Sequence, residues 1–138
     1  MSAIITGTKI SGYGGAAASL EKQFEHLVRE FPDIAGIHQW GTLNIFLDYP
    51  LRITSPDYTT SFIEWTPDNS ERFSFTKVGL QVTPQSQPLD GWIYVAHRSP
   101  HRGNALLVEI LTATVEISDQ SQVAIFLPAY RYSSCLVL

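Results

Sequence analysis

The chain has 138 residues, which allows one domain with one hydrophobic core and leaves little for a second. Hydrophobic residues make up 44% and charged residues 16%, the balance of a globular protein and not of a disordered one. The 9 Lys and Arg residues stand against 13 Asp and Glu, so the net charge is −4. This sign argues against a general nucleic-acid or anionic-membrane binder, which needs a basic face. We therefore expect a single domain over residues 1–138 without a nucleic-acid or membrane partner.

The sequence also predicts a cytoplasmic protein. The only cysteine, Cys135, has no partner for an internal disulfide. The first residues, Met1–Gly7, have neither a basic region nor the long apolar run of a secretory signal. No apolar stretch is long enough to span a bilayer. The pattern leaves the oligomeric state open.

Most predicted elements are strands, rich in β-branched and aromatic residues and separated by Pro, Gly, Asn, Asp and Ser. They cover Ala3–Lys9, Thr42–Asp48, Thr60–Trp65, Arg72–Val82, Gly91–His97, Ala105–Thr112 and Val123–Leu127. After the first strand, one helix is predicted from Ser19 to Phe31, with Ser19 as its N-cap and Pro32 after its end. Many short strands with one helix favour a closed β-barrel, which leaves no exposed edges, although periodicity alone does not exclude a sandwich.

The first candidate for chemistry is the glycine-rich segment between the first strand and the helix. It reads Gly12-Tyr13-Gly14-Gly15-Ala16-Ala17-Ala18. Glycines allow a sharp turn and close approach to a ligand, and the helix N-terminus beyond offers unpaired N–H groups to a phosphate. An ordinary strand-to-helix turn explains the segment equally well.

The second candidate is the pair Thr42 and Asn44, in Gly41-Thr42-Leu43-Asn44. Side chains alternate along a strand, so the two oxygen donors share one face, opposite to Leu43 and Ile45. Mg²⁺ accepts a few such oxygens and completes its shell with water and phosphate. From the residues alone, a strand edge with two polar residues facing water is the simpler interpretation.

The third candidate is Glu109, within the apolar run Ala105–Leu111. A buried carboxylate without a partner is costly, and Leu107 and Leu111 share its face. The carboxylate therefore either faces solvent or lies beside a substrate hydroxyl, which it could orient or deprotonate. By contrast, His97 and His101 flank an irregular turn without a third metal ligand, and we expect them to be exposed.

Taken in order, these motifs resemble the archaeal-type CTP-dependent riboflavin kinases, which have a closed six-stranded cradle-loop barrel with one α-helix. That family has a glycine-rich loop after its first strand, then a helix, then a Gly-Thr-Leu-Asn motif. The resemblance continues through Asp90–Val95, Ser99-Pro100-His101 and Glu109-Ile110-Leu111, and closes with a turn and last strand at Ile117–Ile125. It runs from about Ile4 to Leu127.

The resemblance implies a role for each matching position. Thr42 and Asn44 would be Mg²⁺ ligands, and Ser99 and Glu109 would contact the flavin. Together with the chemistry of its position, this makes Glu109 the candidate catalytic residue. The implied nucleotide-binding residues are Gly12, Tyr13, Gly14, Gly15, Ala16, Ala17, Thr114, Val115, Glu116 and Ile117.

The implied reaction is Mg²⁺-dependent transfer of the γ-phosphate of CTP to the ribityl hydroxyl of riboflavin, giving FMN. One alternative is a non-catalytic module that binds a flavin or a nucleotide on the same barrel, and another is a kinase for a different small alcohol. The Thr42 and Asn44 pair favours catalysis. Glu116 favours the binding module, because the family carries basic residues in that segment and an acid repels a triphosphate.

Overall fold

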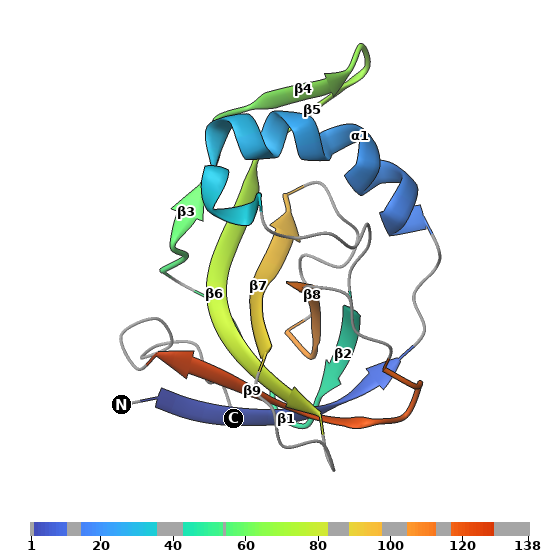
Figure 1. Cartoon of the computed structure of the whole chain (residues 1–138), viewed down its shortest axis with the longest axis vertical. Coiled ribbons are helices and arrows are strands. Elements are labelled where there is room, and N and C mark those ends of the chain that lie inside the picture. Colours follow the sequence, from blue (N-terminus) through green and yellow to red (C-terminus); the bar gives the residue numbers. More distant parts are fainter. Residues whose placement is uncertain are drawn as a thin grey trace.

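The computed structural model describes residues 2–10, 15–35, 43–53, 55–82, 89–97, 105–112 and 117–128. Six antiparallel strands form a closed barrel in the order β6-β7-β8-β2-β1-β9, and pairing between β6 and β9 completes the ring (Figure 1). These strands are β1 (Ser2–Ile10), β2 (Leu43–Leu47), β6 (Phe73–Val82), β7 (Leu89–Ala96), β8 (Leu107–Thr112) and β9 (Gln122–Pro128). The predicted mostly β fold with a closed six-stranded barrel is confirmed.

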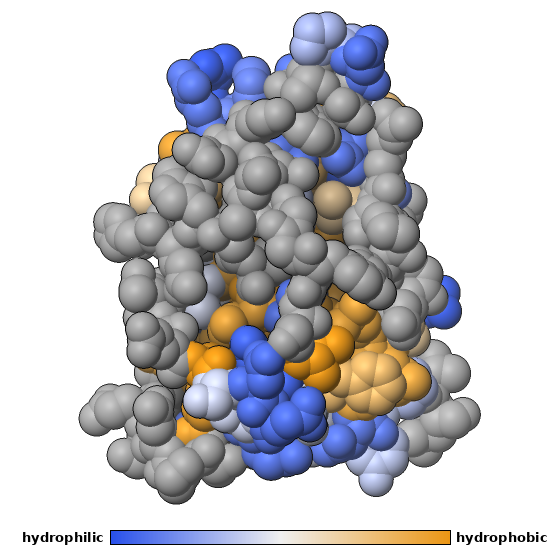
Figure 2. Space-filling view, turned by 90° about the vertical axis from the view of Figure 1, so that its right-hand side faces the viewer, coloured by the Kyte–Doolittle hydropathy of each residue, from blue (hydrophilic) through white to orange (hydrophobic). Residues whose placement is uncertain are grey.

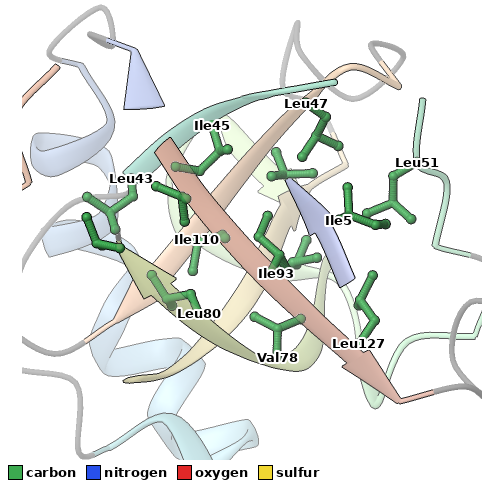
Figure 3. Close-up of a cluster of buried hydrophobic side chains, with 14 of the residues drawn as sticks. Ile5, Leu43, Ile45, Leu47, Leu51, Val78, Leu80, Ile93, Ile110 and Leu127 are labelled. Carbon is green, nitrogen blue, oxygen red and sulfur yellow. The ribbon is translucent and has the colours of Figure 1, made fainter. Parts of the chain in front are cut away.

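Alternating side chains fill the barrel. In β2 the residues Leu43, Ile45 and Leu47 are buried, while the residues between them are half-buried or exposed. They meet Ile110 of β8 and Leu80 of β6 in one apolar cluster inside the ring (Figure 3). Burying a side chain of this size stabilises a fold by about 1.5–3 kcal/mol. The period-two pattern of the sequence therefore decides which face of each strand points inward.

A second apolar layer lies outside the barrel, under the helix. The helix α1 (Gly15–Glu30) is the only α-helix in the described part of the chain, and it lies across one end of β6 and β7 (Figure 1). Its Leu27 packs with buried side chains on the outer faces of β6, β7 and β8. These are Phe73, Phe75, Trp92, Tyr94, Ala96 and Leu111. The long strand β6 contributes to both layers, since its first half is buried beneath α1 and its second half inside the barrel.

Smaller elements complete the structure around the helix. The short helix η1 (Pro32–Ile34) follows α1, and β3 (Tyr58–Thr59) pairs with β6. The strands β4 (Ile63–Thr66) and β5 (Asn69–Glu71) form a separate hairpin, drawn beyond α1 in Figure 1. No helix of the described residues is long and apolar enough to cross a membrane.

The prediction for the start of the helix is wrong. Helix α1 begins at Gly15, so Ser19 lies inside it and is not its N-cap. Alanines 16–18 are strong helix formers, and they extend the helix toward the glycines. The helix ends before Pro32 as predicted, with Arg29 in its last turn.

The predicted strand Thr60–Trp65 is also partly wrong. Strand structure begins only at Ile63, because Thr60 is held by a side-chain bond in place of a regular ladder. The Phe73 N–H donates to Thr60 Oγ1 at 3.0 Å, and the Thr60 N–H donates to the Phe73 carbonyl at 2.8 Å. Such local bonds compete with strand pairing. The strands β3 and β5 have no counterpart among the predicted elements.

Candidate functional site

Two residues that the sequence singles out separately lie opposite each other. Asn44 of β2 pairs with Glu109 of β8 in the antiparallel ladder. Directly opposed residues share one face of a sheet, with Cβ atoms about 4.5–5.5 Å apart. Asn44 is half-buried, and its neighbours Leu43 and Ile45 point into the barrel, so its side chain points out of the barrel. The fold therefore brings the proposed Mg²⁺ ligand beside the proposed catalytic carboxylate.

Glu109 faces the layer between the barrel and the helix. Its neighbours Val108 and Ile110 belong to the barrel core, whereas Leu111, on its own face, belongs to the cluster beneath α1. The Glu109 side chain is half-buried. The choice left open by the sequence, between bulk solvent and a protected position, is thus decided in favour of partial protection.

Tyr94 of β7 extends this polar face, and the sequence analysis missed it. Ile93 pairs with Ile110, and Tyr94 and Glu109 are the next residues beyond that pair on the two strands. The Tyr94 hydroxyl donates to Gln23 Oε1 of α1 at 2.7 Å, and both side chains are buried. Burial, then the negative charges of Glu109 and Glu71, raise the pKa of the Tyr94 hydroxyl far above its ordinary value. Tyr94 is therefore a neutral hydrogen-bond donor near Glu109 at any physiological pH.

No local motif reveals Tyr94 or Gln23. In the sequence, Tyr94 belongs to an ordinary hydrophobic strand. Gln23 is a polar residue beside the apolar stripe of a helix, where a solvent-facing side chain is the usual expectation. Only 2% of its surface is exposed, and this burial becomes visible only when the helix is placed on the barrel.

The glycine-rich segment follows β1, whose last residue lies beside this face, and continues into α1. Ile10, the last residue of β1, pairs with Asn44, so the segment leaves the barrel beside the proposed Mg²⁺ ligand. Residues Gly12, Tyr13 and Gly14 lie outside the described residues, and Gly15, Ala16 and Ala17 form the first turn of α1. This places Gly15–Ala17 in a helix and not in a loop. The N–H groups of a first helical turn have no intrahelical acceptor and suit an anion.

The second predicted nucleotide segment is described only at Ile117. Residues Thr114, Val115 and Glu116 lie outside the described residues. The Ile117 side chain is 9% exposed and packs in the barrel core, so only its backbone could reach a ligand.

The turn that follows Ile117 is joined to the end of β1. The Gln120 N–H donates to the Lys9 carbonyl at 2.7 Å, and the Lys9 N–H donates to the Ser121 carbonyl at 2.9 Å. The Lys9 ammonium forms an ion pair with Asp119. Gln120 has φ of 71°, the left-handed region that glycine adopts most easily. This turn, the end of β1 and Asn44 therefore lie at one end of the barrel.

Figure 2 shows the side of the molecule that faces right in Figure 1, toward the start of α1 and the end of β1. Apolar and hydrophilic side chains adjoin each other in the lower half of this view. Phe46 of β2, two residues beyond Asn44 on the same outer face, is 45% exposed. An aromatic surface thus lies next to the polar pair.

Some predicted residues cannot be placed, and one expectation is wrong. Thr42 and Ser99 lie outside the described residues. His97 is half-buried and not exposed, because its Nε2 lies 2.7 Å from Ser74 Oγ and its N–H donates to the Arg72 carbonyl at 3.0 Å. Within the described ranges, no group of three or more His, Cys, Asp or Glu side chains could hold a metal ion.

A depression of about 360 Å³ lies elsewhere, between the C-terminal half of α1 and β4. It is lined by His26, Arg29, Glu30, Ile63 and Glu64, and by none of the residues predicted for the site. We therefore assign the candidate chemistry to the face that carries Asn44 and Glu109 because of the chemical groups on it, and not because that face is hollowed.

Neither the models of known protein families nor the curated protein sequences give a match to this chain. The function must therefore be argued from the site itself. Its described parts are the Asn44 amide oxygen and the half-buried Glu109 carboxylate, beside the end of β1 from which the chain continues to α1.

Proposed function

We propose that the protein is a riboflavin kinase built on a cradle-loop barrel. It transfers the γ-phosphate of a nucleotide, with CTP as the expected donor, to the ribityl hydroxyl of riboflavin and forms FMN. The observation that carries the proposal is the direct pairing of Asn44 with Glu109. The resemblance assigns the metal to Asn44 and a flavin contact to Glu109, and phosphoryl transfer requires the metal and the acceptor hydroxyl to be close.

The donor set fits Mg²⁺. The ion prefers hard oxygen ligands, and it uses few from the protein when phosphates and water supply the rest. The Asn44 amide oxygen is such a ligand, and Thr42 would supply a second. When bound, the ion supplies neutralisation of the phosphate charge.

The remaining steps belong to the chain's own groups. Backbone N–H groups of the glycine-rich segment and of the first turn of α1 would bind the phosphates, since the first four N–H groups of an α-helix have no intrahelical acceptor. Glu109 would orient the ribityl hydroxyl and accept its proton as the new O–P bond forms and the nucleoside diphosphate leaves. Partial burial favours this role, because water competes less for the carboxylate.

The test is incubation of the protein with riboflavin and Mg²⁺ and with CTP, ATP, GTP or UTP in separate reactions, followed by chromatography for FMN. FMN formed with CTP above the other nucleotides supports the proposal in full. FMN formed equally with all four supports the kinase but removes the CTP preference. Controls without Mg²⁺, and with Asn44→Ala, should give no FMN.

The same experiment separates the kinase from the non-catalytic binding module. If no nucleotide yields FMN, riboflavin and CTP are titrated separately by calorimetry. Binding without turnover would replace the kinase by a flavin- or nucleotide-binding module. Turnover of another small alcohol in the same assay would keep the phosphotransfer and change the substrate.

A further inference from the structure

We propose that the Tyr94–Gln23 hydrogen bond is a positioning contact, which fixes the N-terminal half of α1 relative to the Asn44 and Glu109 pair. Gln23 lies outside the motifs that led to the proposed reaction, and Tyr94, although it lies within Asp90–Val95, has no assigned role in that reaction. The structural claim stands by itself, and its consequence for nucleotide binding rests on the proposed function.

The contact links the helix to the strand next to Glu109. Tyr94 is 7% exposed and Gln23 is 2% exposed, and the 2.7 Å between the hydroxyl and Oε1 is an ordinary, well-formed hydrogen bond. The apolar residues around it, Leu27, Phe73 and Leu111, exclude water from the same layer. A buried polar pair of this kind adds little net stability but allows only one arrangement of its partners, because any sliding leaves both groups unpaired.

The Tyr94–Gln23 contact, the Gln23 anchor, has a counterpart at the C-terminal end of α1. This second polar contact, the Glu30 anchor, is made by the Glu30 carboxylate. The Glu30 carboxylate accepts bonds from the Ser61 N–H at 2.7 Å and from the Tyr58 hydroxyl at 3.1 Å. With a rise of about 1.5 Å per residue, Glu30 lies about 22 Å along the axis from Gly15, whereas Gln23 lies about 12 Å from it. Gln23 is therefore the anchor nearer to the turn that carries the proposed phosphate-binding N–H groups.

Tyr94 acts through position and not as an acid or base. It donates to Gln23 and stays neutral beside the carboxylates of Glu109 and Glu71. If the side chains at positions 94 and 23 only had to fill space, Phe and Leu would serve there as well as Tyr and Gln. Replacing both partners by apolar side chains of similar shape is often nearly neutral for stability. The double variant can therefore separate positioning from packing.

The experiment compares wild type with Tyr94→Phe/Gln23→Leu by urea unfolding and by amide hydrogen exchange followed residue by residue. We expect a similar unfolding midpoint, with exchange from Ser19 to Gln23 roughly three- to tenfold faster, the ratio that corresponds to loss of one hydrogen bond. These amides are the first in α1 with an intrahelical acceptor. Exchange at Leu27–Glu30 should be unchanged. Exchange unchanged at Ser19–Gln23 would overturn the positioning role.

Two further measurements complete the test. Glu30→Gln is the matched control at the other anchor, and it should accelerate exchange near the C-terminal end of α1 while leaving Ser19–Gln23 as in wild type. In the FMN assay, the double variant should raise KM for the nucleotide several-fold and leave KM for riboflavin near wild type. An unchanged nucleotide KM would overturn the functional consequence. Absence of FMN from wild type would refute the proposed kinase, while the exchange data would still decide the positioning role.

Discussion

Gly7 of β1 offers a sharp test of how tightly the barrel closes behind the site. A Cβ at this position would lie 2.7 Å from Ile45 Cγ2, 2.7 Å from the Phe46 carbonyl oxygen and 3.2 Å from Leu47 Cα. Carbon atoms in contact normally stay about 3.5–4.0 Å apart, so the first of these contacts is about 0.8 Å too short. Two of the three obstacles are backbone atoms of β2, which cannot rotate away. Gly7→Ala must therefore displace β2, the strand that carries Asn44.

The expected cost of Gly7→Ala is that of overpacking a core, about 1–3 kcal/mol in the free energy of unfolding. For a chain of 138 residues this corresponds to a fall in Tm of roughly 3–10 °C. Gly79→Ala in β6 is the matched control, because its Cβ would meet Phe126 and Leu89 at 3.6–3.9 Å, which is ordinary contact. It should leave stability unchanged or raise it by about 0.4–1 kcal/mol through the unfolded state.

Urea unfolding followed by tryptophan fluorescence measures the free energy of unfolding of both variants. The two midpoints are compared with the same dependence of this free energy on urea concentration. A Gly7→Ala variant as stable as Gly79→Ala would show that β2 accommodates the added methyl group without strain. We also expect a lower rate of FMN formation for folded Gly7→Ala, because a displaced β2 moves Asn44 away from Glu109. Full activity together with the expected loss of stability would mean that the strand shift spares the Asn44 end of β2.

Three further predictions address the site and the helix. Asn44→Ala should abolish turnover with thermal stability nearly unchanged, and near-normal FMN formation would refute its metal role. Glu109→Gln should lower turnover by roughly 10²–10⁴-fold with riboflavin affinity nearly kept, while the exposed control Glu64→Gln keeps full activity; unchanged turnover would exclude proton acceptance. Burial alone would raise the pKa of Glu30, but hydrogen bonds from the loop before β4 lower it below its ordinary 4.5. Its carboxylate therefore stabilises the fold above that value and loses this effect as the pH falls through the folded pKa. Glu30→Gln should be less stable than wild type at pH 7, and this difference should shrink as the pH falls through the folded pKa of Glu30, unlike the solvent-exposed control Glu25→Gln, in urea unfolding at a series of pH values.

Much of the fold follows from local patterns. Alternation of apolar and polar residues predicts six of the barrel strands within a few residues, because each strand has one face toward an apolar layer. The spacing of Phe24, Leu27 and Phe31 predicts the helix and its buried face. Where the prediction fails, a different local effect decides the boundary of the element. Helix-forming alanines move the start of α1 to Gly15, and side-chain bonding by Thr60 delays the start of β4.

The sequence by itself determined the inward and outward faces of the strands, and it marked Asn44 and Glu109 one at a time as unusual polar positions. Only the tertiary structure decided that these two residues, far apart in the chain, are opposed across β2 and β8, and that the end of β1 lies beside them. It alone revealed Tyr94 and Gln23 as partners and the closure of the ring by β6 and β9. The physical reason is that periodicity reports the burial of a single segment. The register between distant strands and the position of the helix on the barrel depend instead on how all the segments pack together.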